Sequence, residues 1–74
     1  MDYKQNEMIL AHLRDVGGIT QQEAAKRYGC ERLGARIYDL RQRGYDIRSE
    51  TERGVNRFGR ATHWTRYWLV ETRE

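Results

Sequence analysis

The chain has 74 residues, no proline and one cysteine, and its 14 basic and 11 acidic side chains give a formal net charge of +3. One cysteine excludes a disulfide within the monomer, and no apolar run approaches the roughly 20 residues of a membrane-spanning helix. We therefore expect one small cytoplasmic domain over residues 1–74, with a core from about 5 to 70 and no membrane contact.

The positive charge is concentrated in the second half of the chain. Residues 32–66 hold nine arginines against four acidic residues, whereas residues 1–31 hold four basic against five acidic residues. Arginine donates to phosphates and guanine edges through a planar fork, and a segregated basic region is the usual footprint of nucleic-acid binding. A solvated arginine-rich surface would give the same composition, so charge alone leaves both interpretations open.

The first predicted helix begins at about Gln5 or Asn6 and ends at Asp15. Asn6 is its expected N-cap. Its apolar stripe, at spacings of 3 and 4, consists of Ile9, Leu10, Leu13 and Val16. Gly17-Gly18 ends the helix, because glycine readily adopts the left-handed conformation that follows a helix.

The segment from Ile19 to Ala25 predicts a second helix. Ile19 is expected to form a short strand that joins a later sheet and to act as a hydrophobic staple. Thr20 and Glu23 form a T-x-x-E capping box, which is a clear start signal for a helix. Ala24 and Ala25 are expected to let this helix pack closely on its neighbour.

A third helix is predicted from about Glu31 to Arg43, after a turn at Gly29 with positive φ. Its buried face is expected to consist of Leu33, Ile37 and Leu40, at spacings of 4 and 3. Gly34 in the helix interior costs about 1 kcal/mol relative to alanine, so its small size is expected to allow close approach of DNA or of the second helix.

Two strands are predicted at residues 46–50 and 64–70, joined by a long polar and basic loop over residues 51–63. Alternation in the last strand places Tyr67 and Leu69 on one face and Trp64, Arg66 and Trp68 on the other. If the first set faces the core, the tryptophans lie outside, where neighbouring structure covers them or a partner binds them. A register shift of one residue would reverse this assignment.

Enzyme chemistry finds little support, and we expect no enzyme activity, no cofactor and no metal. Cys30 adjoins the third helix and is expected to be a small, partly buried residue rather than a nucleophile. His12 is expected on the surface or partly covered, because no second histidine, cysteine or carboxylate cluster completes a metal site.

The predicted order of helix, short strand, two helices and two strands is the winged helix-turn-helix topology, an α+β (mainly α) domain of three helices and a C-terminal β-hairpin wing. The run R-I-x-x-L-R-x-x-G-x-x-I from Arg36 to Ile47 resembles the end of the recognition helix and the start of the wing in many bacterial winged-helix regulators. Residues 20–25 with Gly29 resemble the front half of their helix-turn-helix, and Arg66-Tyr67-x-Leu69 resembles their closing wing strand. The whole is similar to short standalone helix-turn-helix proteins of bacteriophages and prophages.

This resemblance implies a double-stranded DNA-binding protein of the transcription-regulator type, in a bacterial or infected host cell. The third helix would read the major groove, and the basic wing would contact phosphates or a minor groove. The residues expected to contact DNA are Arg32, Arg36, Arg41, Arg43, Arg53, Asn56, Arg57 and Arg60. Trp64 and Trp68 are the expected interface with a second copy of the chain or another protein.

Two other functions stay open from the sequence. One is a protein-interaction module, such as a phage-encoded inhibitor of a host protein, and the other is a DNA-bending accessory factor in recombination. Glu31 and Asp39 place negative charge on or near the predicted recognition helix. Asp39 is spaced to pair with Arg36 or Arg43, which would give those arginines a structural use.

Overall fold

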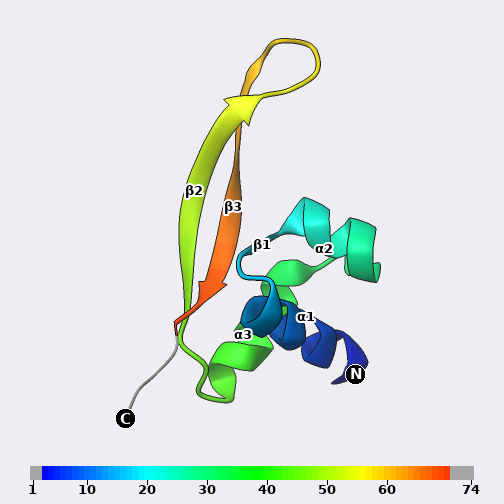
Figure 1. Ribbon diagram of the computed structural model, residues 1–74, viewed down its shortest axis with the longest axis vertical. Helices are drawn as coiled ribbons and strands as arrows, with labels where there is room; N and C mark the ends of the chain where they lie inside the picture. The colour runs from blue at the N-terminus through cyan, green and yellow to red at the C-terminus, as the bar shows by residue number, and fades with distance from the viewer. Residues whose placement is uncertain (1–2, 71–74) are drawn as a thin grey trace.

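The computed structural model describes residues 3–70, and its elements follow the predicted order. They are α1 (Tyr3–Asp15), β1 (Ile19–Thr20), α2 (Gln21–Tyr28), α3 (Leu33–Gln42), β2 (Ile47–Val55) and β3 (Ala61–Leu69). The three helices gather at one end of the molecule, and the β2–β3 hairpin extends well beyond them (Figure 1). The domain is therefore elongated, with extents of 43 × 28 × 20 Å.

The strands form one antiparallel sheet in the order β1-β3-β2. Ile19 lies opposite Tyr67, which confirms the short strand expected there. The hairpin register runs from Ile47 opposite Leu69 to Val55 opposite Ala61. The prediction of a loop over residues 51–63 was wrong, because only residues 56–60 connect the strands. The stretch is polar because it stands beyond the helices and water reaches it, yet residues 51–55 pair with residues 61–65 across the hairpin.

The core forms where α1, α3, β1 and the base of the hairpin meet. Its buried apolar side chains are Ile9, Leu10, Leu13, Ile19, Ala24, Cys30, Leu33, Ile37, Leu40 and Ile47. This confirms the predicted buried face of the third helix. Val16 was wrongly assigned to the stripe of the first helix, since it lies in the turn after Asp15 and is 63% exposed.

Asn6 and His12 were also placed wrongly. The helix begins at Tyr3, so Asn6 lies inside it, is buried, and donates from Nδ2 to Asp39 Oδ2 at 3.4 Å. His12 is buried, with Nε2 3.1 Å from the Gly18 carbonyl and Nδ1 2.8 Å from the Tyr28 hydroxyl. Because a carbonyl only accepts, Nε2 carries a proton, and in the neutral ring Nδ1 accepts from Tyr28. Its polar atoms thus tie α1 to α2 within the core.

A capping box begins α2, and a glycine and a glutamine shape the turn from α2 to α3. Thr20 and Glu23 form the predicted capping box, and Gly29 has the predicted positive φ, at 66°. Gln21 adds a clamp that no sequence pattern indicated: its Oε1 accepts from Leu33 N and its Nε2 donates to the Cys30 carbonyl, both at 2.8 Å. Gln21 therefore binds the start of α2 to the start of α3.

Two details of this helix pair differ from expectation. Ala24 is buried but Ala25 is exposed, so only one of the two alanines packs against a neighbour. The third helix is shorter than predicted, since Arg32 is its N-cap and Arg43 its C-cap. None of the helices within residues 3–70 has the length and apolar character needed to cross a membrane.

Candidate nucleic-acid interface

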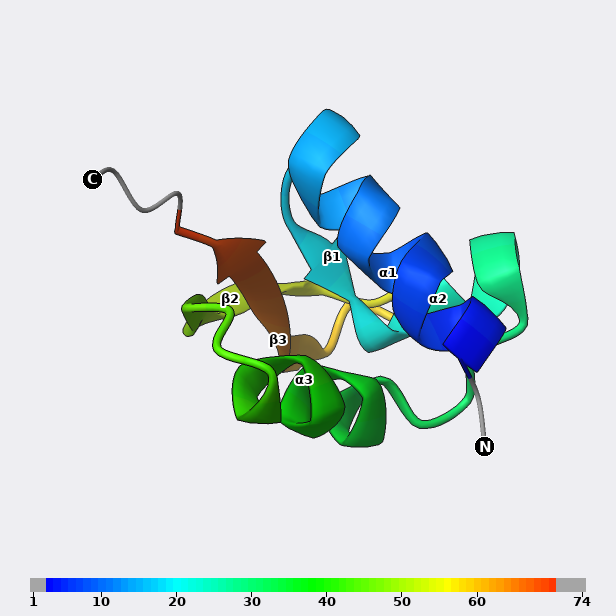
Figure 2. The same ribbon diagram turned by 90° about the horizontal axis from the view of Figure 1, so that it is seen from below.

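The side of α3 opposite its buried face is open to solvent. Figure 2 shows α3 along the lower edge of the view, with α1 on the other side of the core. This outward side presents Gly34, Tyr38, Arg41 and Gln42, all exposed. Tyr38 is 62% exposed and lies four residues after Gly34, so the two sit on one stripe. Sequence reasoning did not select Tyr38, although its position opposite Ile37 and Leu40 was the available signal.

Gly34 faces open space. A Cβ atom built there would meet no heavy atom of the described chain within 4 Å. The expectation that its small size serves packing on the second helix was therefore wrong. The alternative, close approach of an external backbone to this part of α3, stays a prediction.

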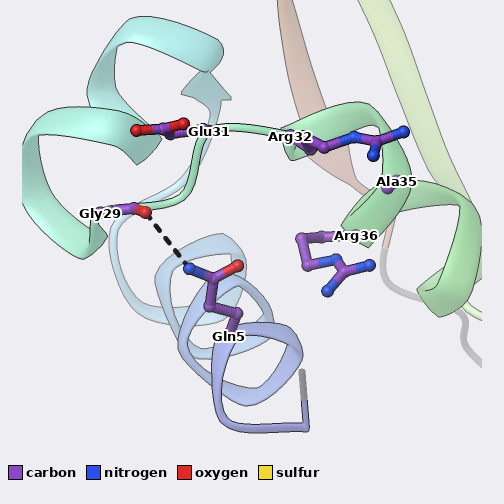
Figure 3. Close-up of a pocket in the computed structure, with 6 residues that line it drawn as sticks. All are labelled: Gln5, Gly29, Glu31, Arg32, Ala35 and Arg36. Atoms are coloured by element: carbon purple, nitrogen blue, oxygen red, sulfur yellow. Dashed lines mark hydrogen bonds between the residues drawn. The ribbon is translucent and has the colours of Figure 1, made fainter. Parts of the chain in front are cut away.

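The N-terminal end of α3 borders an open groove of about 460 Å³. Arg32 is exposed there, and Figure 3 shows its side chain running along α3, whereas Glu31 points to the opposite side, toward α2. Gln5 closes the base of the groove by donating to the Gly29 carbonyl at 3.3 Å. The negative charge of Glu31 is thus separated from the arginine that would contact DNA first.

Arg36 and Arg41, which were predicted to contact DNA, make side-chain contacts within the chain. Arg36 has a side chain only 15% exposed and lies 3.3 Å from Asp39 Oδ2. Asp39 also accepts from Asn6 of α1, so this cluster links α1 to α3. Arg41 donates from Nε and Nη2 to the Ile47 carbonyl, at 3.1 and 2.7 Å. It thereby fixes the end of α3 to the start of the hairpin.

The two faces of the hairpin differ in charge. Ile47, Tyr67 and Leu69 lie against the core, so alternate residues beyond them share the same face. We call this part the inner wing face, and it consists of Thr51, Arg53, Val55, Ala61, His63 and Thr65. The opposite side, the outer face, consists of Arg48, Glu50, Glu52, Trp64, Arg66 and Trp68. All carboxylates of β2 and β3 therefore lie on the outer face.

The wing tip extends this acid-free surface. Residues 53–63 contain three arginines, a histidine and no acidic residue. Arg53 lies opposite His63, and Arg57 and Arg60 are exposed in the connecting turn. Asn56 shapes that turn, since its Oδ1 accepts from the backbone of Phe58 and of Arg60 at 2.9 and 3.1 Å. Its carbonyl oxygen is thus already used within the chain.

The comparison with protein families agrees with this arrangement of helix pair and hairpin. The family described as the winged helix-turn-helix domain matches residues 4–72. The chain belongs to the winged helix-turn-helix family. Neither a curated protein nor a solved structure gave a match. The predicted fold and the predicted winged helix-turn-helix family are confirmed, and the winged helix-turn-helix is a DNA-binding domain.

No residues in the described part of this winged helix-turn-helix form a metal site, since no group of three or more histidine, cysteine, aspartate or glutamate side chains is placed to hold an ion. Cys30 is completely buried rather than partly buried as expected. Its thiol lies among the apolar side chains of the core, away from the surface that a substrate would reach.

The outer wing face carries a hydrogen-bonded network that joins the wing to α2. Glu52 accepts from Trp64 Nε1 at 2.7 Å and from Arg66 Nε at 2.9 Å, and Arg66 Nη1 reaches Glu23 Oε1 at 3.0 Å. Glu23 Oε1 also accepts from Thr20 N in the capping box. The hydrogen bonds from Arg66 and then Trp64 lower the pKa of Glu52, and the bond to Glu52 raises the pKa of Arg66.

The tryptophans lie on this outer face, in the arrangement expected if Tyr67 and Leu69 pack on the core. Each rests on glycine: a Cβ at Gly18 would come within 2.9 Å of Trp68, and one at Gly54 within 2.7 Å of Trp64. Neighbouring structure therefore covers part of both rings. Trp64 and Trp68 still keep 38% and 40% of their surface exposed.

The Glu52 network predicts a pH-dependent stability. Because the folded pKa of Glu52 lies below its unfolded value of about 4.3, its contribution is present above that pH and is lost as pH falls through the folded pKa. Glu52→Gln is therefore expected to lower the melting temperature at neutral pH, with the difference from wild type shrinking in acid. Thermal unfolding followed by circular dichroism measures this.

The matched control for this prediction is Glu50→Gln, which changes an exposed carboxylate of the same face. It should alter the melting temperature less at neutral pH. A Glu52→Gln effect that stays constant from neutral pH down to acid unfolding would contradict the role assigned to the ionised carboxylate.

Proposed function

We propose that this winged helix-turn-helix binds double-stranded DNA with the outward side of α3 in the major groove and the inner wing face and tip on phosphates or in a minor groove. The observation that carries the proposal is the separation of charge across the hairpin. The carboxylates of β2 lie on the outer face, and Arg53, Arg57 and Arg60 lie on the inner face or at the tip. The inner wing face and the tip therefore attract a polyanion, and no carboxylate on this surface would repel it.

The orientation of α3 indicates which of its residues would contact DNA bases. In helix-turn-helix proteins the N-terminal part of the recognition helix contacts base edges. Arg32 at the N-cap and Tyr38 on the exposed stripe are therefore our candidates for base contact. Arg43 lies exposed at the other end of α3 and would reach a phosphate. Arg36, Arg41 and Asn56 would act mainly by positioning the helix and the wing.

We further propose that the protein regulates transcription in a bacterial cytoplasm, as a regulator of the phage or prophage type. One recognition helix reads only a few base pairs, so useful specificity needs two half-sites or a second protein. A dimer on a two-fold symmetric site would supply this.

A second candidate function uses the outer wing face for protein contact. It is favoured by the partial exposure of Trp64 and Trp68, since tryptophan and arginine are frequent anchors of protein interfaces. This face lies opposite the inner wing face, so protein contact and DNA contact are compatible.

The first prediction for DNA binding concerns the wing. Arg53→Ala, Arg57→Ala and Arg60→Ala should each weaken binding and reduce the slope of log affinity against log salt by about one unit, because each removes one phosphate contact. Titration of a fluorescent duplex, first a random and then a selected one, at several salt concentrations measures both quantities.

Arg48→Ala is the matched control, because Arg48 is exposed on the outer face and pairs with Asp46. Its salt slope should equal that of the wild type. Unchanged slopes for all three wing variants would refute DNA contact by the wing.

A second prediction concerns α3. Arg32→Ala and Tyr38→Ala should reduce discrimination between a selected and a random duplex, by about 1–3 kcal/mol for a lost bidentate arginine–guanine contact. Folding should survive, because both side chains are exposed. Arg27→Ala, an exposed change on α2, should leave discrimination unchanged. Equal discrimination in all variants would contradict reading by this side of α3.

A third prediction concerns self-association. Sedimentation or light scattering of the protein with a selected duplex should give the mass of two chains per site. Trp68→Arg should shift the mass toward one chain per duplex, because each copy would bring an added positive charge into the two-fold contact and the two charges would repel. A mass of one chain per duplex for the wild type on every selected duplex would contradict the proposed dimer.

A further inference from the structure

The tip of the wing holds an aromatic side chain in a defined turn. Gly59 N donates to the Asn56 carbonyl at 2.9 Å, which places Arg57 and Phe58 at the two central positions of a β-turn. The Asn56 side chain bonds the backbone of Phe58, and Gly59 takes the positive φ of 79° that the reversal requires. Phe58 is thus presented at the far end of the hairpin by a turn that hydrogen bonds to Asn56 stabilise.

Phe58 has no packing role in the domain. It is 79% exposed, the highest value among the large hydrophobic side chains of residues 4–70, and lies outside the core cluster. With Val55 and Trp64 it borders an open groove of about 710 Å³, whose other side is the start of α2. Exposing a phenylalanine to water in this way gives no stability to the fold, whereas a ligand that buries the ring would account for its position.

The charge around Phe58 fits a nucleic acid. Arg57 precedes it, Arg60 follows two positions later, and no acidic residue occurs from Arg53 to His63. Two cations beside an exposed ring match a groove in which phosphates flank stacked bases. The inner wing face, which leads to the tip from the core, is also free of carboxylates.

The hairpin is long enough for this contact. Its nine-residue strands span about 30 Å at the usual rise of a strand. The minor groove next to a major-groove contact lies half a helical turn away, about 17 Å. The tip can therefore reach a neighbouring minor groove while α3 occupies the major groove.

We propose that Phe58 is a wedge that enters between two base pairs from the minor groove, with Arg57 and Arg60 on the flanking phosphates, and kinks the duplex. Apolar side chains inserted in this way unstack a base step and bend DNA by roughly 20–90° toward the major groove. The inference rests on the proposed DNA binding and assigns to the wing an action, bending, that phosphate contact alone does not provide.

Bending by Phe58 can be measured apart from binding. The probe is a selected duplex with fluorescent dyes at its ends and 2-aminopurine at successive steps of the wing-side minor groove. The wild type should raise energy transfer between the ends and increase 2-aminopurine fluorescence at one step. Phe58→Ala should abolish both signals and lower affinity about tenfold, yet keep the salt slope, because no phosphate contact is lost.

Two further variants complete the experiment. Phe58→Leu keeps an apolar wedge and should restore much of the bend. Val16→Ala truncates another exposed apolar side chain, at the end of α1, and should behave as the wild type. A bend of equal size in wild type and Phe58→Ala, or a straight duplex in a wild-type complex that binds, would overturn the wedge alone. A wild type that binds no duplex would overturn the proposed function as well.

Discussion

The burial of one side of α3 is the interaction on which the rest of this domain depends. A helix of ten residues is marginal in water by itself, so α3 persists because Leu33, Ile37 and Leu40 pack into the core. Each such side chain contributes about 1.5–3 kcal/mol when removed from water. Rigid burial of one side also sets the opposite side at a fixed orientation. The stripe that carries Tyr38 is therefore presented without a ligand having to order it.

Polar contacts then set the position of the other elements around α3. Gln21 binds the start of α2 to the start of α3, and Arg41 binds the end of α3 to Ile47 at the base of the hairpin. Glu52, Arg66 and Glu23 join the hairpin to the capping box of α2. These contacts use groups that would otherwise look available for a ligand. Because of these contacts, the number of arginines in the sequence overstates the number of side chains that can contact DNA.

The sheet divides the remaining charges between two surfaces. Alternation along β2 and β3 leaves Arg53 and His63 on the inner wing face and collects Glu50 and Glu52 with the tryptophans on the outer face. A polyanion and a protein partner would thus meet different sides of one hairpin. The hairpin extends beyond the helices and places its basic tip away from the core. At this tip, the turn that Asn56 shapes presents Phe58 between Arg57 and Arg60.

Local patterns in the sequence determined the fold and the buried side of α3. The capping box at Thr20, the glycine turn at Gly29 and the apolar spacing of α3 each involve only a few neighbouring residues. Such local signals can therefore be recognised without knowing the tertiary structure. The length of the wing was missed, because a strand exposed on both faces has the polar composition of a loop. The pairing of Arg36 with Asp39, three residues along one helix, was expected from its spacing. Burial of His12, the engagement of Arg41 and the Gln21 clamp depend instead on contacts between different elements. Only the tertiary structure decided them, since a polar side chain bonds whichever group folding brings within about 3 Å.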